Sequence, residues 1–346
     1  MQIKQVPKDF IVTEIPLIRE FKGGHYSYFE MEKEGLTTSR AAKMIAQKLG
    51  IRLSDVGFAG AKDSRATTKQ QISVRKNHHN DLLVASNLNL KYLGNFDRPL
   101  SLGELEGNSF ELIVRDVGLM EATVIESNVL LLEKMDFFVP NYFDEQRFSV
   151  QNVDIGTMLL KKDYAPAVEL LQKQAEFSMI KDYLLKYPRD FVGAIRLIPR
   201  RQAMLFVHSV QSHLFNEIAA MYLKRLGVEC REVQYSRGSF VFPIEKVEQV
   251  MLPLPGFGAQ LDDWLKEYVD ALMHEHQIRE QDFINRSIPD LSLEEGERTF
   301  LMKVGNFSMT AFKEDELNPG KMKFRFAFSL PKGSYATMVI KFLGSG

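Results

Sequence analysis

The sequence predicts an α+β fold in which a sheet-rich domain contains both ends of the chain and a helix-rich α/β domain is inserted between them. Segments rich in β-branched and aromatic residues lie before residue 118 and again from residue 299, as expected for strands. The block between them shows mainly helical patterns. Since 346 residues are enough for two domains, we expect one domain from 1–151 plus 306–346 and an inserted domain from 152–305.

Local patterns predict most of the individual elements. Residues 9–16 (DFIVTEIP) and 26–32 (YSYFEME) favour strands. Thr37 or Thr38 can cap a helix that ends at Gly50, because a hydroxyl accepts hydrogen bonds from the first turn and glycine suits the end of the last. The further predicted elements are a strand at 70–75, two short strands within 100–117 joined through Gly103 and Gly107, and helices over 120–135, 163–186, 200–226 and 261–276.

The C-terminal region predicts one more strand and a terminal element. The segment 324–328, FRFAF, alternates phenylalanine with other residues, which is typical of a strand with one buried face. Gly333 and Ser334 then indicate a turn that leads into a final helix or strand.

Composition limits the classes of protein to consider. Hydrophobic residues make up 45% of the chain and charged residues 26%, which is ordinary for a globular protein with a sizeable core. The net charge of −1 does not by itself indicate a nucleic-acid-binding protein. Cys230 is the single cysteine, so an internal disulfide is excluded and a reducing, cytoplasmic location is expected. No signal peptide, no apolar stretch of about 18 residues and no heptad pattern is evident, so we expect no membrane partner and a monomer.

One loop, "VGFAGAKDSRATTKQ" at 56–70, combines glycines with a carboxylate among cations. Glycines suit a tight loop that a ligand can approach closely. Asp63 lies among Lys62, Arg65 and Lys69, and nearby positive charge favours the ionised form of a carboxylate. Such a group can act in catalysis beside an anionic substrate. The same pattern also occurs in ordinary surface ion pairs, so the loop alone leaves both interpretations open.

Several other kinds of site are not supported by the motifs. The glycine spacing of this loop differs from that of a P-loop, and Asp63 stands where a hydroxyl residue would hold magnesium. No G-x-S-x-G nucleophile motif and no zinc-type Cys/His spacing occurs. The pairs His208/His213 and His274/His276 lack the spacing of a metalloprotease motif, so we interpret them as core or surface histidines. The sequence therefore predicts no metal and no nucleotide cofactor.

A second stretch, "VPNYFDEQRF" at 139–148, has the residue types of a base-binding pocket. An aromatic ring can stack on a base that has left its helix, an amide can read the edge of the base, and an arginine such as Arg147 can bind phosphate. Alternatively, the stretch is a core segment with an exposed arginine.

Five stretches in order resemble the tRNA pseudouridine synthases of the TruD type. The loop resembles the family signature that contains G-x-K-D, and the stretch at 139–148 resembles its N-Y-F…Q-R-F motif. Three other stretches are similar to family motifs: "KQVPKDFIVTE" at 4–14, "LGELEGNSFEL" at 102–112 and "LPKGSYATMVIKFL" at 330–343. The resemblance implies a mixed or antiparallel sheet in the pseudouridine synthase catalytic domain and identifies 152–305 with the inserted TRUD domain of the family. The family often has glycine where this chain has Asp144 and Ser149, and phenylalanine where it has Tyr335.

The resemblance implies an isomerase that converts a uridine of tRNA, at position 13 in the D arm, to pseudouridine without a cofactor. It implies that Asp63 is the catalytic carboxylate and that Lys4 holds it ionised. It further implies the substrate-binding residues, which are Phe10, Asn141, Phe143 and Tyr335, with Arg65 and Lys69 on the RNA backbone. Three alternatives remain open at this point: an RNA-binding or chaperone-like protein without turnover, a modifier of uridines in other RNAs, and a nucleotide-dependent phosphotransferase.

Overall fold

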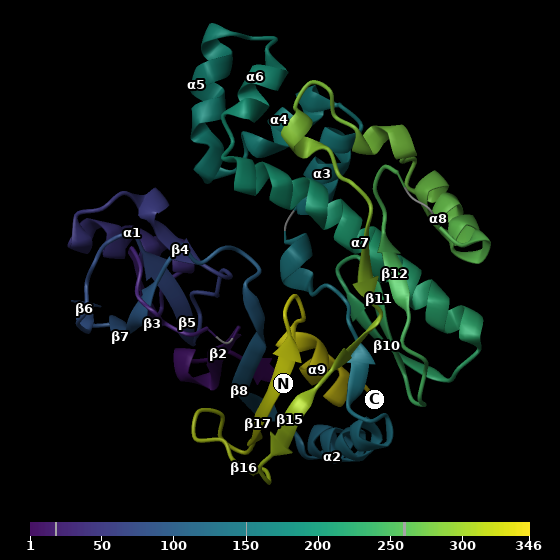
Figure 1. Cartoon of the computed structure of the whole chain (residues 1–346). Helices are drawn as coiled ribbons and strands as arrows, with labels where there is room; N and C mark the ends of the chain where they lie inside the picture. Colours follow the sequence, from purple (N-terminus) through teal and green to yellow (C-terminus); the bar gives the residue numbers. More distant parts are fainter. Residues whose placement is uncertain (18, 150, 259–260) are drawn as a thin grey trace. The chain divides into compact units, whose positions relative to one another are not determined.

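The computed structural model describes residues 1–17, 19–149, 151–258 and 261–346, and these fall into two compact units (Figure 1). Unit 1 comprises Met1–Glu133 and Met302–Val339, and unit 2 comprises Lys134–Leu301 and Ile340–Gly346. Unit 1 thus combines two segments that are far apart in the sequence. The predicted α+β class is confirmed. The compact units divide at other positions than 152 and 305, which stay predictions for the borders of the inserted domain.

An 11-stranded sheet forms the body of unit 1, in the order β15-β17-β8-β2-β5-β3-β7-β6. The pair β2–β5 is parallel, and the other pairs along this path are antiparallel. The short strands β1, β16 and β4 pair with β8, β17 and β5. The bounds are β1 Gln2–Ile3, β2 Phe10–Pro16, β3 Tyr26–Glu34, β4 Val56–Phe58, β5 Thr67–Val74, β6 Leu82–Ala85, β7 Leu88–Phe96, β8 Leu105–Val117, β15 Gly305–Met309, β16 Lys313–Glu314 and β17 Met322–Pro331.

Helix α1 (Thr38–Leu49) packs on this sheet through an apolar face and has the predicted caps. The Thr37 hydroxyl accepts a hydrogen bond of 3.2 Å from the Arg40 backbone N–H, and Gly50 ends the helix at φ 65°. Buried side chains of α1 such as Ile45 share a core with Phe29 of β3 and other sheet residues. Full burial of each such side chain stabilises the fold by roughly 1.5–3 kcal/mol, so this face fixes α1 on the sheet.

The strand prediction for 100–117 was wrong in detail, because one strand, β8, starts only at Leu105. Gly107 lies inside β8 opposite β17, and a Cβ atom added to it would stand 2.2 Å from the Leu330 carbonyl oxygen. A glycine within a strand often marks such a close backbone approach rather than a turn.

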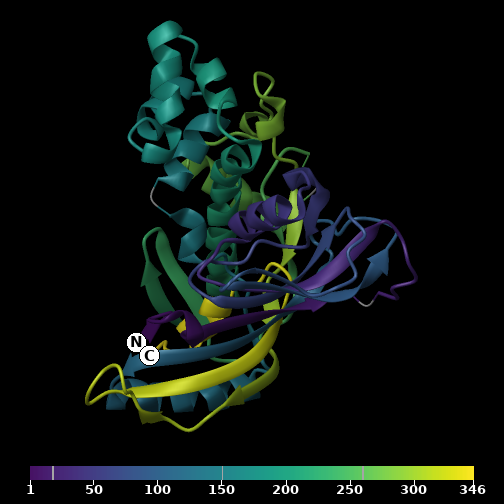
Figure 2. The same ribbon diagram turned by 90° about the vertical axis from the view of Figure 1, so that its left-hand side faces the viewer.

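The C-terminal predictions are confirmed. Phe324, Phe326 and Phe328 of β17 are buried, whereas Arg325 is exposed. Figure 2 shows β17 in yellow running beside β8 in blue, as their antiparallel pairing requires. After a turn at Gly333, with φ 81°, the chain enters α9 (Ala336–Leu343). Helix α2 (Leu119–Lys134) matches the predicted helix at 120–135.

Unit 2 is organised around the 27-residue helix α7 (Arg200–Leu226), which was predicted at the same residues. It packs against α3, α8, β11 and β12. The other elements of this part of the chain are β9 Phe138–Pro140, α3 Asn152–Leu160, α4 Tyr164–Leu171, α5 Ser178–Lys186, α6 Phe191–Arg196, β10 Cys230–Tyr235, β11 Gly238–Pro243, β12 Met251–Leu254, α8 Asp263–Glu275 and β13 Gly296–Thr299, with β14 Leu301–Lys303 at the border of the units.

The predicted single helix over 163–186 was wrong, because the chain forms α4 and α5 with a break between them. Gln174 adopts an extended conformation, and Phe177 is buried against the ring of Phe206 of α7, with 6.1 Å between the ring centroids. Burial of this aromatic side chain overrides the local helical pattern.

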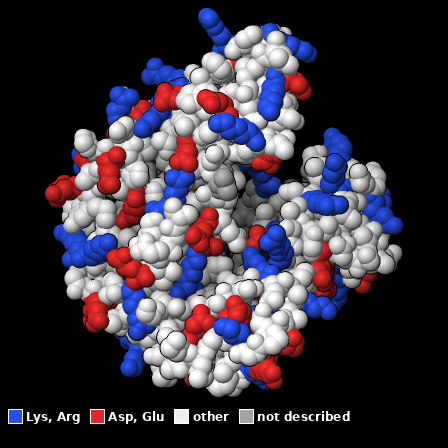
Figure 3. Space-filling model, turned by 180° about the vertical axis from the view of Figure 1, so that it is seen from behind, with Lys and Arg blue, Asp and Glu red and all other residues white. Residues whose placement is uncertain are grey.

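The surface is mixed in charge. On the face seen in Figure 3, acidic and basic side chains are interspersed, in keeping with a net charge of −1. Within the part of the chain that the structure describes, no helix is both long enough and apolar enough to span a bilayer.

Candidate active site

Asp63 lies in unit 1, on the loop between β4 and β5, and its side chain is 52% exposed. The Lys4 ammonium donates a hydrogen bond of 2.7 Å to Asp63 Oδ2. The same ammonium lies 4.1 Å from the centroid of the Phe10 ring, a cation–π contact. Lys4 therefore contacts two other residues predicted from the sequence, Phe10 and Asp63, although Lys4 and Asp63 are 59 positions apart.

The N-terminal segment is anchored so that Lys4 reaches the loop. Asp9 is buried, accepts a hydrogen bond of 2.9 Å from the Val6 backbone N–H, and forms an ion pair of 2.9 Å with Arg115 of β8. Arg115 also pairs with Asp315 at 2.7 Å. Lys4 itself has φ 64°, a conformation that is uncommon outside glycine. Asp9, within the motif at 4–14, thus holds the segment that carries Lys4. The buried Phe10 ring lies beneath the Lys4 ammonium.

A buried lysine, Lys33 of β3, supports the backbone of the loop. Its side chain donates hydrogen bonds to the carbonyl oxygens of Leu36, at 2.6 Å, and Asp63, at 3.0 Å, and the residue is only 1% exposed. Burial lowers the pKa of Lys33 to about 8; the negative charge of Asp63 acts in the opposite direction, and the positive charge of Lys62 adds to the lowering. The main chain at Asp63 is therefore fixed from inside the sheet.

Lys62, the neighbour of Asp63 in sequence, extends to a different partner. Its ammonium lies 3.0 Å from Glu14 Oε2 in a buried ion pair, and Glu14 also accepts a hydrogen bond of 3.1 Å from the Gln71 backbone N–H. The Lys62 backbone N–H donates to the Thr38 hydroxyl at 2.8 Å. That hydroxyl donates to Gln70, whose amide nitrogen donates to the Gly60 carbonyl oxygen. This network connects the loop to β2, α1 and β5, so the loop is held rigidly while the Asp63 side chain is left accessible.

The other predicted residues of unit 1 lie on its surface. Arg65 is exposed, and Lys69 of β5 lies 3.7 Å from Glu32, a half-exposed pair. Tyr335 is half-buried at the start of α9, where its carbonyl oxygen accepts a hydrogen bond from the Met338 backbone N–H.

The predicted residues of unit 2 form a second group. Asn141 is 4% exposed, and its side-chain amide is occupied by protein partners. Its Oδ1 accepts a hydrogen bond of 2.7 Å from Arg298, and its Nδ2 donates to the carbonyl and hydroxyl oxygens of Thr299. The Arg298 guanidinium lies 4.2 Å from the centroid of the half-buried Phe143 ring. Asn141 thus fixes an arginine against the ring that was predicted to help form a pocket.

The backbone around Phe143 is also fixed, and the aspartate that departs from the family pattern is neutralised. Asn216 of α7 exchanges two hydrogen bonds of 2.9 Å with the main chain of Phe143. Asp144 is buried and forms an ion pair of 3.0 Å with Lys341, which also pairs with Glu145 at 2.9 Å. The extra negative charge therefore has a partner within unit 2.

The sequence analysis did not identify the residues that hold the Asp63 loop and the Asn141 segment in place. Lys33 could have been found, because the period of two along β3 places it on the buried face with Phe29 and Met31. A lysine is rarely buried unless it has a hydrogen-bonding or charged partner. Glu14 gave the same signal, because the period of two along β2 places it on the buried face with Phe10 and Val12. Arg298 gave no such signal, because its partner is distant in the chain. None of these residues belongs to the group of potential metal ligands found among the described residues, which consists of His213, Glu217 and His276.

Comparison with known proteins agrees with this arrangement of motifs. The family model described as "tRNA pseudouridine synthase D (TruD)" matches residues 1–180, 172–234 and 242–342. "Probable tRNA pseudouridine synthase D 2" of Methanocaldococcus jannaschii is 30% identical, over 99% of this chain and 92% of that protein. "tRNA pseudouridine synthase D" of Aquifex aeolicus is 28% identical, over 99% and 97%.

A solved structure shows the same fold. The crystal structure of a TruD-type protein from Methanosarcina mazei has a TM-score of 0.66 to this chain at 24% identity, covering 99% of this chain and 93% of that one. Together with the family model, which covers most of the sequence, these likenesses establish that the chain belongs to the tRNA pseudouridine synthase D family.

Proposed function

We propose that this protein isomerises a uridine of tRNA, at position 13 in the D arm, to pseudouridine, with Asp63 as the catalytic carboxylate. The observation that carries the proposal is the half-exposed Asp63 side chain, paired with Lys4 at 2.7 Å on a loop held from within the sheet. An accessible carboxylate on a rigid support is the arrangement that a catalytic group requires. Family membership supports the choice of reaction and of tRNA as the partner.

The reaction breaks the bond between ribose C1′ and uracil N1 and rejoins the base through C5. No atoms are gained or lost, so the reaction balances with side chains alone. Lys4 binds Oδ2 of Asp63, which leaves the second oxygen to attack C1′, add to C6 of the base or take a sugar proton. In each of these routes Lys4 would hold the carboxylate in place through its hydrogen bond to Oδ2.

The target nucleotide must leave its stack to reach a carboxylate on a protein loop. This step costs a few kcal/mol, and stacking on an aromatic side chain returns about 1–3 kcal/mol per base. We propose Tyr335 and Phe143 as rings that contact the RNA. Asn141 and Phe10 are buried, so we propose that they act mainly by holding Arg298 and Lys4. Arg65 and Lys69 are surface cations suited to the RNA backbone.

We also propose that residues 1–151 and 306–346 form the catalytic domain and that 152–305 form the inserted domain of the family. The placement of the Asp63 loop and its supports Lys4, Lys33 and Glu14 within unit 1 supports the first assignment.

The test is conversion of uridine in tRNA by the parent and by Asp63→Asn, with Asp97→Asn, a change at another exposed aspartate of unit 1, as the control. We expect Asp63→Asn to reduce turnover by about 10²–10⁴-fold, the typical effect of removing a general acid or base. Its affinity for tRNA should be retained. Conversion at the parent rate by Asp63→Asn would refute the assignment.

The same assay separates the alternatives. Binding of tRNA without conversion by the parent would favour the RNA-binding interpretation, and conversion that requires ATP would favour a nucleotide-dependent enzyme. Mapping pseudouridine in total RNA from cells with and without the protein distinguishes position 13 of tRNA from uridines in other RNAs.

A further inference from the structure

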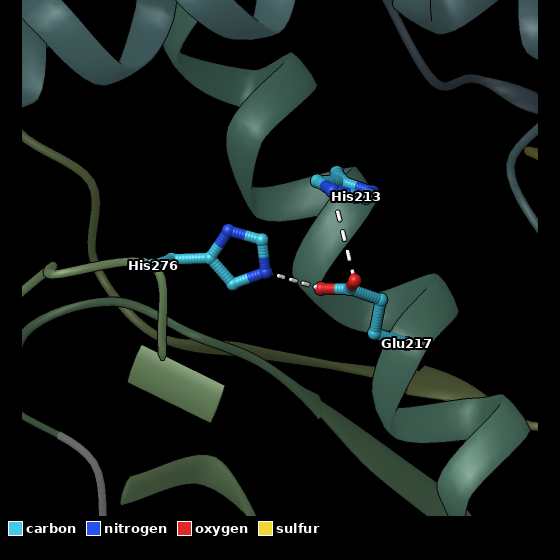
Figure 4. A group of neighbouring side chains, drawn as sticks. All are labelled: His213, Glu217 and His276. Carbon is cyan, nitrogen blue, oxygen red and sulfur yellow. Dashed lines mark hydrogen bonds and ion pairs between the residues drawn. The ribbon is translucent and has the colours of Figure 1, made fainter. Parts of the chain in front are cut away.

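Three potential metal ligands converge in unit 2 (Figure 4). His213 and Glu217 lie one turn apart on α7, and His276 directly follows α8. Figure 4 shows the His276 ring pointing at the Glu217 carboxylate, from a segment that lies opposite α7. His276 Nε2 is 2.7 Å from Glu217 Oε2, and His213 Nε2 is 3.8 Å from Glu217 Oε1.

His213 lacks the hydrogen bonds that a buried imidazole normally makes. The residue is 5% exposed, and its Nδ1 has no hydrogen-bond partner. Its Nε2 lies 3.8 Å from Glu217 Oε1, beyond hydrogen-bonding distance. Buried polar groups are generally paired, and an exception in a native fold can mark the place of an ion. This observation is independent of the clustering itself.

The geometry suits one ion between the three side chains. The ligand atoms all lie within 4.8 Å of one another. In a tetrahedral zinc site with bonds of about 2.1 Å, ligand atoms are about 3.4 Å apart. The 2.7 Å contact must therefore open slightly and the longest separation must close, which rotations of half-buried Glu217 and His276 permit.

We propose that His213, Glu217 and His276 bind a divalent transition-metal ion such as Zn²⁺. Two imidazoles and one carboxylate form a known zinc ligand set that leaves the fourth position for water. Of the three side chains, Glu217 also lines a pocket of about 240 Å³, together with Glu275.

The charged residues around the three side chains are compatible with a bound cation. Arg237 also lines the pocket, but it forms a bidentate ion pair with Asp154 at 2.7 and 3.0 Å, so its charge is offset. Lys161 donates to the His276 carbonyl oxygen at 3.2 Å and so fixes the backbone of one ligand. Glu275 adds negative charge at the pocket.

The ion would connect α7 to the residue that follows α8 and stabilise unit 2, because a metal that binds only the folded chain shifts the equilibrium toward it. The histidine spacing concealed this site in the sequence. The i, i+4 pair is a histidine and a glutamate, and the second histidine is 59 positions after Glu217.

The experiment titrates Zn²⁺ into the metal-free, untagged full chain in competition with a chromophoric chelator and follows thermal unfolding with and without Zn²⁺. We expect one ion per chain and a higher melting temperature with Zn²⁺. Glu217→Gln and His276→Ala should each weaken binding by at least about tenfold, the smallest loss typical of damaged metal sites, and should abolish the thermal shift. His274→Ala, at an exposed histidine two positions away on α8, is the matched control and should bind like the parent.

Both ligand variants change half-exposed residues, so circular dichroism can verify that they fold, whereas His213→Ala alters a buried residue and is secondary. Absence of binding by the parent, or equal affinity of the parent and both ligand variants, would overturn the proposal. Because the readout is metal binding and stability, the result is independent of pseudouridine formation.

Discussion

The Asp63 loop of unit 1 and the Asn141 segment of unit 2 use their family motifs in opposite ways. In the loop, the motif carboxylate is exposed and its supports Lys33, Lys62 and Glu14 are buried. In the segment, the motif residue Asn141 is itself buried, and what it holds is Arg298 beside the Phe143 ring. A motif residue can therefore present chemistry or position another group, and burial distinguishes the two roles.

The largest change in stability is expected at the support of the loop. Lys62→Met removes one partner of a buried ion pair and leaves Glu14 charged and unpaired, which typically costs about 3–5 kcal/mol. Urea unfolding measures this loss. Lys69→Met is the matched control, because its pair with Glu32 is half exposed and contributes about 0–1 kcal/mol. Equal losses for the two variants would contradict the buried support.

The next largest effect is a dependence of folding stability on pH, which arises from Lys33. Its folded-state pKa is about 8, below the ordinary value of 10.5, so the unfolded chain binds more protons between these values. Stability should therefore rise with pH from about 8 to 10.5, by up to about 3 kcal/mol. The measurement is the difference in unfolding free energy between the parent and Lys33→Met across this range. A difference that does not change with pH would show that the Lys33 pKa is not lowered.

A smaller loss of stability is expected at Asn141. Asn141→Ala removes the Oδ1 that accepts a hydrogen bond from Arg298, and a hydrogen bond to a charged group contributes about 1.5–3 kcal/mol. Turnover should fall only in part, because the carboxylate at Asp63 is unchanged. Unfolding by urea together with tRNA conversion measures both quantities. Full stability with complete loss of conversion would instead indicate that Asn141 acts directly in the chemistry.

The smallest change in stability is expected at Asp63 itself. Its pair with Lys4 is half exposed, and such pairs contribute about 0–1 kcal/mol, so Asp63→Ala should unfold at nearly the parent's urea concentration. If Asp63→Ala keeps almost the parent's stability but loses turnover, Asp63 presents chemistry, whereas Asn141 positions another group. A loss above about 2 kcal/mol would place Asp63 among the structural supports instead.

The sequence predicted much of unit 1 because its signals are local. The strands β2 and β3, the caps of α1 and the alternation in β17 depend on neighbouring residues, and all were confirmed. The start of β8 and the break between α4 and α5 were predicted wrongly, because close packing at Gly107 and burial of Phe177 involve residues far along the chain.

By itself the sequence determined the family, the α+β class and the identity of the carboxylate to examine, because ordered motifs and residue periodicity can be read one segment at a time. The family resemblance also led us to expect the pair of Lys4 and Asp63, but only the tertiary structure decided that the adjacent Lys62 pairs with Glu14 and that His213, Glu217 and His276 meet. The direction of a side chain and its distance from a partner tens of residues away depend on how the chain folds back on itself, which no local pattern encodes.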